Sequence, residues 1–274
     1  ETARWPCLPG FTTLVHEGRF PMARDTTGGL RWHLRAFLRR RHWRLTTDLI
    51  ADWLDRTQPR HDELLLIGGS AGWMMSGRWL QRFRRVVLVD IDPHAARLFR
   101  FNHARALQQS GTQFQAVQLD AMHALETLLA EHPAASVFFD NVLGQQVYRV
   151  PALDLAERAL ERMAERLAGR DWGSVHDLFS GPVEPGRRPS EPQMSFVAMN
   201  SPQGMTVDGL TGTPLHKRLL AQVGGSGEWM DHLTSNVFPS GAQTRLIAWP
   251  FLPHYAHWLQ AGWVPPDDPK GLKC

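Results

Sequence analysis

Apolar and polar positions alternate along the middle of the chain in the way expected of strands and helices that follow one another. Apolar runs typical of buried strands lie within residues 63–72, 86–92, 115–122, 135–145 and 173–179. Apolar positions at helical spacing fill the segments between them, at residues 71–83, 93–109, 121–131 and 151–168. Strands that alternate with helices predict an α/β fold with a parallel, doubly wound sheet, whose ligands bind at the carboxyl ends of the strands.

The same patterns predict elements on both sides of this core. Two amphipathic helices precede it, with Leu34, Phe37 and Leu38 on the inner face of the first, and we expect them to cover one edge of the sheet. After the fifth strand the pattern predicts, in order, a short strand at 194–199, a helix at 214–222, a strand at 242–250, a helix at 253–260 and a last strand at 263–264.

These patterns suggest a division of the chain into an N-terminal helical extension and one larger domain. We expect the extension at residues 1–58 and the domain at residues 59–274, with an insertion at about 181–213 that is rich in Gly and Pro. An insertion at this point lies near the ligand crevice, so we favour a lid or wall over it. A variable surface loop is the alternative.

Small residues follow the first predicted strand, where a strand-to-helix turn is expected. A dinucleotide loop of the form Gly-x-Gly-x-x-Gly needs a third glycine where this chain has Trp73 or Met74, which argues against NAD or FAD. The shorter spacing Gly-x-Gly-x-Gly is met at Gly68 and Gly72, with Ser70 in the middle. Glycines in such a turn also serve geometry in any α/β protein, so the loop alone does not decide the ligand.

Acidic residues end three of the strands that follow or flank this loop. Asp90, Asp120 and Asp140 come directly after apolar runs. With the glycine loop, these acids make residues 60–180 resemble the class I S-adenosylmethionine (SAM) dependent methyltransferases. The resemblance implies a mostly parallel Rossmann-like sheet closed by an antiparallel strand, with N-terminal helices and a cap insertion after strand five.

The resemblance also implies SAM as the cofactor and a set of cofactor-binding residues. The loop passes close to the methionyl part of SAM, Asp90 holds the ribose hydroxyls, and the third strand end borders the adenine. The implied cofactor-binding residues are Gly68, Gly69, Ser70, Gly72, Asp90, Ile91, Asp120, Ala121 and Asp140.

Methyl transfer needs alignment of two partners and often a base, so polar residues near strand ends are the catalytic candidates. We select His176, Asp177 and Asn141 as catalytic candidates, and Tyr148 and His232 as substrate contacts. Asn141 instead closes an Asx turn if its role is structural. The aromatic side chains that suggest an acceptor pocket, unless they belong to the core, are Tyr148, Trp73, Trp79, Trp229, Trp249 and Trp263.

The histidines carry weaker signals because the chain has thirteen of them. The pairs His176/Asp177 and Asp231/His232 offer metal-ligand chemistry. No compact ligand spacing accompanies them, so we expect no metal. A hydrogen-bonded structural role is the alternative for each histidine.

Composition agrees with a globular enzyme of 274 residues, 43% hydrophobic and 21% charged. No apolar run approaches the roughly 18 residues that span a bilayer, and the first segment is a poor secretory signal. Cys7 and Cys274 form neither a metal spacing nor a disulfide framework, so a reducing, cytoplasmic setting is expected.

Arginines cluster in the first predicted helical segment, although the net charge is only +3. Such a cluster suits phosphate contacts in a nucleic acid, but a solvated helix face is the reading that we favour. The cluster consists of Arg31, Arg35, Arg39, Arg40, Arg41 and Arg44.

We therefore predict a SAM-dependent methyltransferase that acts on a small-molecule acceptor, with nucleic acid a less favoured partner, no membrane, and a homo-oligomer left open. Two alternatives remain. One is a SAM-using enzyme with other chemistry, aminopropyl transfer or the cyclisation or cleavage of SAM. Against aminopropyl transfer, the loop Gly-Gly-Ser-Ala-Gly lacks the acid of the spermidine synthase loop that it otherwise resembles. The other is a protein that binds or modifies RNA through the arginine-rich helices.

Overall fold

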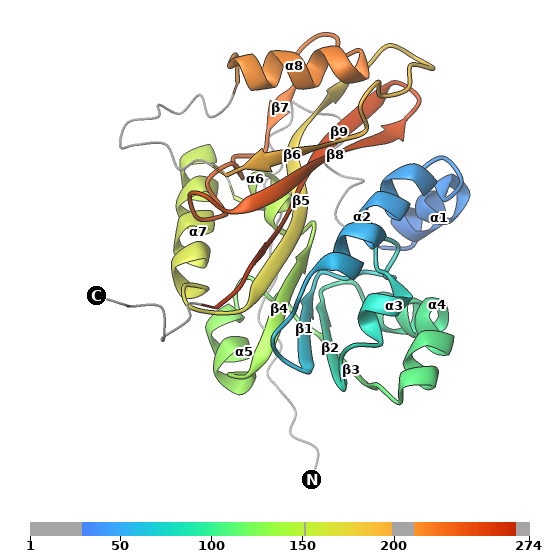
Figure 1. Ribbon diagram of the computed structural model, residues 1–274, viewed down its shortest axis with the longest axis vertical. Coiled ribbons are helices and arrows are strands. Elements are labelled where there is room, and N and C mark those ends of the chain that lie inside the picture. Colours follow the sequence, from blue (N-terminus) through green and yellow to red (C-terminus); the bar gives the residue numbers. More distant parts are fainter. Residues whose placement is uncertain (1–28, 151, 199–210, 267–274) are drawn as a thin grey trace.

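A computed structural model describes residues 29–150, 152–198 and 211–266. Its centre is a nine-stranded sheet in the order β3-β2-β1-β4-β5-β9-β8-β6, with β7 paired to β5 (Figure 1). The strands are β1 (Glu63–Ile67), β2 (Arg85–Asp90), β3 (Gln113–Gln118), β4 (Ala135–Asp140), β5 (Trp172–Pro182), β6 (Gln193–Val197), β7 (Met230–Asp231), β8 (Gln243–Leu252) and β9 (Tyr255–Val264).

Strands β1 to β5 are parallel, and the chain begins this half of the sheet in its middle. Strand β1 lies between β2 and β4, so consecutive strands are added first to one side of it and then to the other. Residues 64–67 of β1 are fully buried because helices cover both faces of the sheet. The reversal of strand order next to β1 opens a crevice at the carboxyl ends of β1 and β4.

The other half of the sheet is antiparallel. Strand β9 inserts between β5 and β8 and runs against both, and β6 extends the edge beyond β8. The predicted α/β fold, a doubly wound, mostly parallel Rossmann-like sheet closed by an antiparallel strand, is therefore confirmed.

The helix predicted at residues 253–260 is wrong, because this segment forms a tight turn and the first part of β9. Residues 256–262 of β9 are all buried. A strand that is buried on both faces lacks the alternation of polar and apolar positions that would reveal it.

Helices cover the two faces of the sheet (Figure 1). A third group of buried apolar side chains includes Leu219 and Val223 of α8. Helices α2, α3 and α4 pack on one face, and α5 and α7 on the other. The helices of the described residues are α1 (Leu30–Arg39), α2 (Arg44–Arg56), α3 (Gly77–Leu80), α4 (Ala95–Ser110), α5 (Leu125–Glu131), α6 (Gln146–Arg149), α7 (Leu153–Arg166) and α8 (Pro214–Val223), with a 3-10 turn at Leu143–Gln145. Within these ranges none of them combines the length and the apolar composition that a membrane crossing requires.

The helix predicted at residues 71–83 is much shorter in the structure. Only α3 is helical there, because Gly72 takes a positive φ of 70° and the chain continues as turns up to Ser76. The side chain of Ser76 caps α3 by accepting the Trp79 backbone N–H. Similarly, α5 begins at Leu125, several residues after the predicted start at 121.

The N-terminal helices are arranged differently from the prediction. Helix α2 belongs to the main core, since Ile50 and Leu54 are fully buried and Thr46 donates a hydrogen bond to the Ala248 carbonyl of β8. Helix α1 does not present its predicted face inward, because Leu34 and Leu38 are 57% and 71% exposed. The insertion expected at 181–213 begins within β5 and includes β6, and its residues 199–210 lie outside the described ranges.

We expect Asp171→Ala, at the start of β5, to destabilise the fold strongly. The buried Asp171 carboxylate accepts hydrogen bonds from the Arg60 backbone, the Ser136 hydroxyl and the Trp263 indole, which lie before β1, in β4 and in β9. Without it three donors lose their acceptor, which should cost about 3 kcal/mol of unfolding free energy in urea titrations. The exposed control Asp48→Ala should change stability by less than about 0.5 kcal/mol. Equal losses in the two variants would contradict this role.

Candidate functional site

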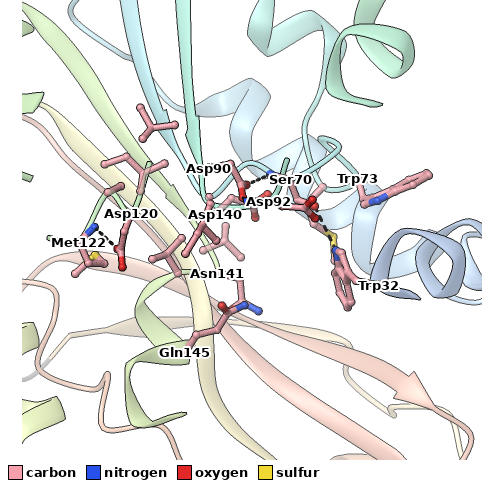
Figure 2. Close-up of a pocket in the computed structure, with 18 of the residues that line it drawn as sticks. Trp32, Ser70, Trp73, Asp90, Asp92, Asp120, Met122, Asp140, Asn141 and Gln145 are labelled. Atoms are coloured by element: carbon pink, nitrogen blue, oxygen red, sulfur yellow. Dashed lines mark hydrogen bonds between the residues drawn. The ribbon is translucent and has the colours of Figure 1, made fainter. Parts of the chain in front are cut away.

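A crevice opens at the carboxyl ends of the central parallel strands, at the point where the strand order reverses. Figure 2 shows carboxylates gathered at its centre, with Trp32 and Trp73 at one end and Asp120 and Met122 at the other. Its wall is completed by α1 and by the strands β8 and β9. The residues that line it are Trp32, Ile67, Gly68, Ser70, Trp73, Met74, Val89, Asp90, Ile91, Asp92, Leu119, Asp120, Ala121, Met122, Asp140, Asn141, Val142, Gln145, Arg149, Val175, Trp249 and Leu259.

The small residues after β1 form the floor of the crevice and serve two different purposes. Gly68 and Ser70 line it, both at positive φ, of 70° and 48°. A Cβ on Gly68 would overlap with Cγ2 of Val142, so the close approach requires glycine. Gly69 and Gly72 do not line the crevice, and their missing side chains make room for Leu66 and His103 instead.

Asp90 holds this loop against the end of β2. Its Oδ2 accepts the backbone N–H of Ser70 at 2.8 Å, and its Oδ1 accepts the N–H of Asp92 at 2.8 Å (Figure 2). Burial raises the pKa of Asp90, although both hydrogen bonds oppose that rise. Each carboxylate oxygen keeps a further lone pair that a ligand hydroxyl can use.

Asp140, at the end of β4, shares the crevice with Asp90. Within the described residues its carboxyl group has neither a hydrogen bond nor an ion pair to support its charge. Burial, with repulsion from Asp90 as the second cause, raises the pKa of Asp140 to about 8. Asp140 therefore ionises easily only if positive charge arrives in the crevice.

The other two acids of the crevice have partners. Asp92 accepts hydrogen bonds from the backbone of Gly29 and His94 and pairs with His33 at 2.9 Å. Burial alone would raise the pKa of Asp92, but these groups lower it. Because Gly29 and His33 belong to the start of α1, Asp92 anchors that helix beside the crevice.

Asp120 is paired on the opposite side of the crevice. It forms an ion pair with Arg149 and contacts His123 at 2.8 Å. Burial opposes ionisation, yet Arg149 and His123 lower the pKa of Asp120. Arg149, already paired, is the only Lys or Arg side chain among the described residues that line the crevice.

Three tryptophans enclose the crevice, and only two of them were among the candidates selected from the sequence. Trp73 and Trp249 line it, whereas Trp79, Trp229 and Trp263, from the same set of candidates, pack elsewhere, the last beside Trp79 and Phe138. Trp32 was not among the candidates. It reaches the crevice because its indole N–H donates to the Ser70 hydroxyl at 3.3 Å, across 38 residues that no local pattern connects.

Asn141 connects the crevice to β5. Its φ is 54°, its side-chain amide donates to Oδ2 of Asp177 at 3.0 Å, and its side-chain oxygen accepts the Asp177 backbone N–H at 2.9 Å. The crevice wall therefore includes Asn141, while its side-chain amide joins β4 to β5. The structural alternative expected from the sequence was an Asx turn, whereas the partner of the side chain is the distant Asp177. These two bonds leave one N–H and one oxygen lone pair of the amide for a ligand.

Beyond Asn141 lies a group of side chains that we call the polar cluster. It consists of the partly buried Tyr255 and of four buried residues, Asp177, Ser180, His232 and His257. Tyr148 stands at its edge, with its ring 5.9 Å from that of His232. The structure thus brings together three of the predicted catalytic and substrate residues, Asp177, Tyr148 and His232. None of the three lines the crevice itself.

His176 lies apart from these residues. Neighbouring residues in a strand face opposite sides of a sheet, so His176 points away from Asp177 and stacks on Phe238 with ring centroids 5.3 Å apart. Burial lowers the pKa of His176 to about 3, so the ring is neutral at ordinary pH. The partner of Asp177 is instead His257, at 2.7 Å. His257 was not among the candidates, because its segment was predicted to be a helix.

The arginine cluster does not reach the crevice. Arg31, Arg40, Arg41 and Arg44 are exposed on and after α1, and none of the six arginines lines the crevice. Their placement agrees with a solvated helix face.

Neither a scan against protein-family models nor a search of curated proteins found a match for this chain. Solved structures similar to it include an O-methyltransferase family protein from Burkholderia thailandensis, at 12% identity and a TM-score of 0.41, which covers 85% of this chain and 59% of its own. The chain thus spans about three fifths of that protein's length.

A magnesium protoporphyrin IX methyltransferase from Synechocystis with bound SAM gives 15% identity, a TM-score of 0.39, and coverage of 90% and 86%. The [4+2]-cyclase SpnF gives 16% identity, a TM-score of 0.30, and coverage of 53% and 48%. At TM-scores below 0.5 these likenesses carry no argument, and the fold rests on the strand order and pairing described above.

We expect the stability of the ligand-free protein to depend on pH through Asp140. Its pKa is 3.8 ordinarily and about 8 in the folded state, so between these values the folded protein holds a proton that the unfolded chain releases. The group therefore lowers stability as pH rises through this window. Asp140→Asn cannot ionise, so its melting temperature relative to the wild type should increase from about pH 5 to about pH 8. A difference that stays constant across this range would contradict the assignment.

Proposed function

We propose that the protein is an enzyme, a SAM-dependent methyltransferase that acts on a small-molecule acceptor. The observation that carries the proposal is the carboxyl pair Asp90 and Asp140 in a crevice whose one arginine is already paired. Such a site favours a cationic ligand, because positive charge stabilises both carboxylates. The sulfonium and ammonium groups of SAM supply this charge.

The residues present fit SAM along the whole crevice. Asp90 keeps free lone pairs for ribose hydroxyls, and Ile91, 58% exposed at the mouth, offers an apolar surface beside them. Leu119, Ala121 and Met122 offer an apolar slot for adenine at the end of β3. Gly68 leaves backbone space for the methionyl part near Asp140.

The same features disfavour a dinucleotide. A pyrophosphate would bring negative charge next to Asp90 and Asp140. The backbone N–H of Ser70, which such a loop would direct at a phosphate, is already bonded to Asp90. The missing third glycine and the acidic charge of the site thus both argue against a dinucleotide.

SAM would supply an electrophilic methyl group, so the work of the protein is to bind, align and exclude water. Asp90 and Asp140 hold the cationic ligand, and Trp32, Trp73 and Trp249 shield it from solvent. The acceptor would enter near Asn141 and Gln145, between the crevice and the polar cluster. Tyr148, His232 and Asp177 are its proposed surroundings, whereas His176 faces the other side of the sheet, against Phe238.

A SAM enzyme with different chemistry would use the same crevice, so SAM binding alone does not distinguish it from a methyltransferase. The reaction product distinguishes them. Methyl transfer leaves S-adenosylhomocysteine, whereas aminopropyl transfer or cleavage leaves methylthioadenosine. The RNA-binding alternative, the cytoplasmic setting and the homo-oligomer stay predictions.

Calorimetry with SAM and S-adenosylhomocysteine tests the proposal, and a folded sample that binds neither would refute it. We expect Asp90→Ala to weaken SAM by on the order of 1.5 to 3 kcal/mol, because the ribose loses a charged hydrogen-bond acceptor. The control Asp62→Ala removes an exposed carboxylate outside the crevice and should bind SAM as the wild type does. Unchanged affinity in Asp90→Ala would exclude Asp90 from the site.

SAM binding should also release a proton from Asp140. At about pH 7 this carboxyl is mostly protonated in the free protein, and a bound cation lowers its pKa, so the proton leaves. Binding enthalpies measured in two buffers of different ionisation enthalpy should reveal this release, and Asp140→Asn should abolish it. If the wild type shows no dependence on the buffer, Asp140 does not respond to the ligand charge.

A further inference from the structure

The polar cluster contains two histidines and a carboxylate, which are more potential metal ligands than methyl transfer requires. His232, Asp177 and His257 come from three distant segments and are 0%, 3% and 6% exposed. One ligand atom from each can be chosen so that all three lie within 4.8 Å of one another. We propose that Asp177, His232 and His257 bind a divalent transition-metal ion.

The orientation of His232 is set in the manner of a metal ligand. Its Nδ1 lies 2.7 Å from the Gly144 carbonyl oxygen, which can only accept, so Nδ1 carries the proton. The lone pair of the neutral ring is therefore on Nε2, 2.9 Å from the Ser180 hydroxyl. Metal-binding histidines commonly donate their other ring N–H to a backbone carbonyl or a carboxylate in this way.

His257 lies directly against the carboxylate of the proposed site. Its Nδ1 lies 2.7 Å from Oδ1 of Asp177, while its Nε2 is buried and has no hydrogen-bond partner among the described residues. An ion held between Oδ1 of Asp177 and Nδ1 of His257 would replace this hydrogen bond, with the ring proton then on Nε2. At His232 the ion would replace the Ser180 hydroxyl as the partner of Nε2.

The donor types indicate the class of metal. Two imidazoles and a carboxylate suit Zn²⁺, Fe²⁺, Co²⁺ or Ni²⁺, whereas Mg²⁺ and Ca²⁺ prefer oxygen ligands throughout. Ser180 and Tyr255, whose hydroxyls lie 3.1 Å apart, add neutral oxygens beside the site. The positive charge of the ion would balance the negative charge of the buried Asp177 carboxylate.

The position of the cluster suggests what the ion would do. Val175 and Leu259 line the crevice. Asp177 lies two residues after Val175 in β5, and His257 lies two residues before Leu259 in the antiparallel β9. An ion there would lie beside the place proposed for the acceptor and would lower the pKa of an acceptor hydroxyl that it binds. This last role rests on the proposed function, whereas metal binding itself does not.

Titration of the chelator-treated, metal-free full-length protein with Zn²⁺, and with Co²⁺ followed by visible absorption, tests the site. We expect one ion per chain, loss of the site in His232→Ala, and about 10- to 100-fold weaker binding in Asp177→Asn. His132→Ala is the matched control, because His132 also pairs with a carboxylate, Glu63 at 2.6 Å, but has no third ligand within the described residues.

If His232→Ala does not fold, His257→Gln removes a ligand while it keeps a side chain of similar length. Wild-type protein that binds neither ion stoichiometrically would overturn the proposal, and so would folded cluster variants that bind as tightly as His132→Ala. SAM is absent from these titrations. Calorimetry with SAM therefore tests the proposed function, and the metal titration tests the metal site independently of it.

Discussion

The glycine loop of this protein is held in place by one carboxylate, and the candidate site depends on that contact. Asp90 accepts the backbone N–H of Ser70, which keeps a non-glycine residue at positive φ and the loop open at the end of β1. The same carboxylate faces Asp140 across the crevice. Asp90 thus both anchors the loop and repels the charge of Asp140. The two acids make the site acidic, whereas the loop of a dinucleotide site would be electropositive.

The second feature that organises the molecule is the length of β5. Its first residues pair with β4 beside the crevice, and its last residues pair with β9 and β7 beside the polar cluster. Asn141 bonds the end of β4 to Asp177 and so joins the two places. A ligand in the crevice and a group bound at the cluster would be neighbours because one strand carries both walls.

Sequence patterns could predict the parallel half of the sheet because most of its strands are apolar and all are separated by helices. They also located Gly68, Ser70, Asp90, Asp120 and Asp140 at the crevice, since residues at the ends of parallel strands must meet at one edge. They failed at β9, where burial on both faces hides the strand period, and so they missed His257. Trp32 and the pairing of Asp177 depend on contacts between distant segments, which no local pattern encodes.

The central claim is that a cationic SAM molecule binds in the acidic crevice at the ends of β1, β2 and β4. Hydrogen exchange measured by mass spectrometry, with and without SAM, locates that binding directly. The account predicts slower exchange in peptides that cover residues 67–74, 89–92, 119–122 and 140–145, with little change in α7 and α8. Exchange that is unaffected in the first two segments, or protection confined to other parts of the chain, would contradict it.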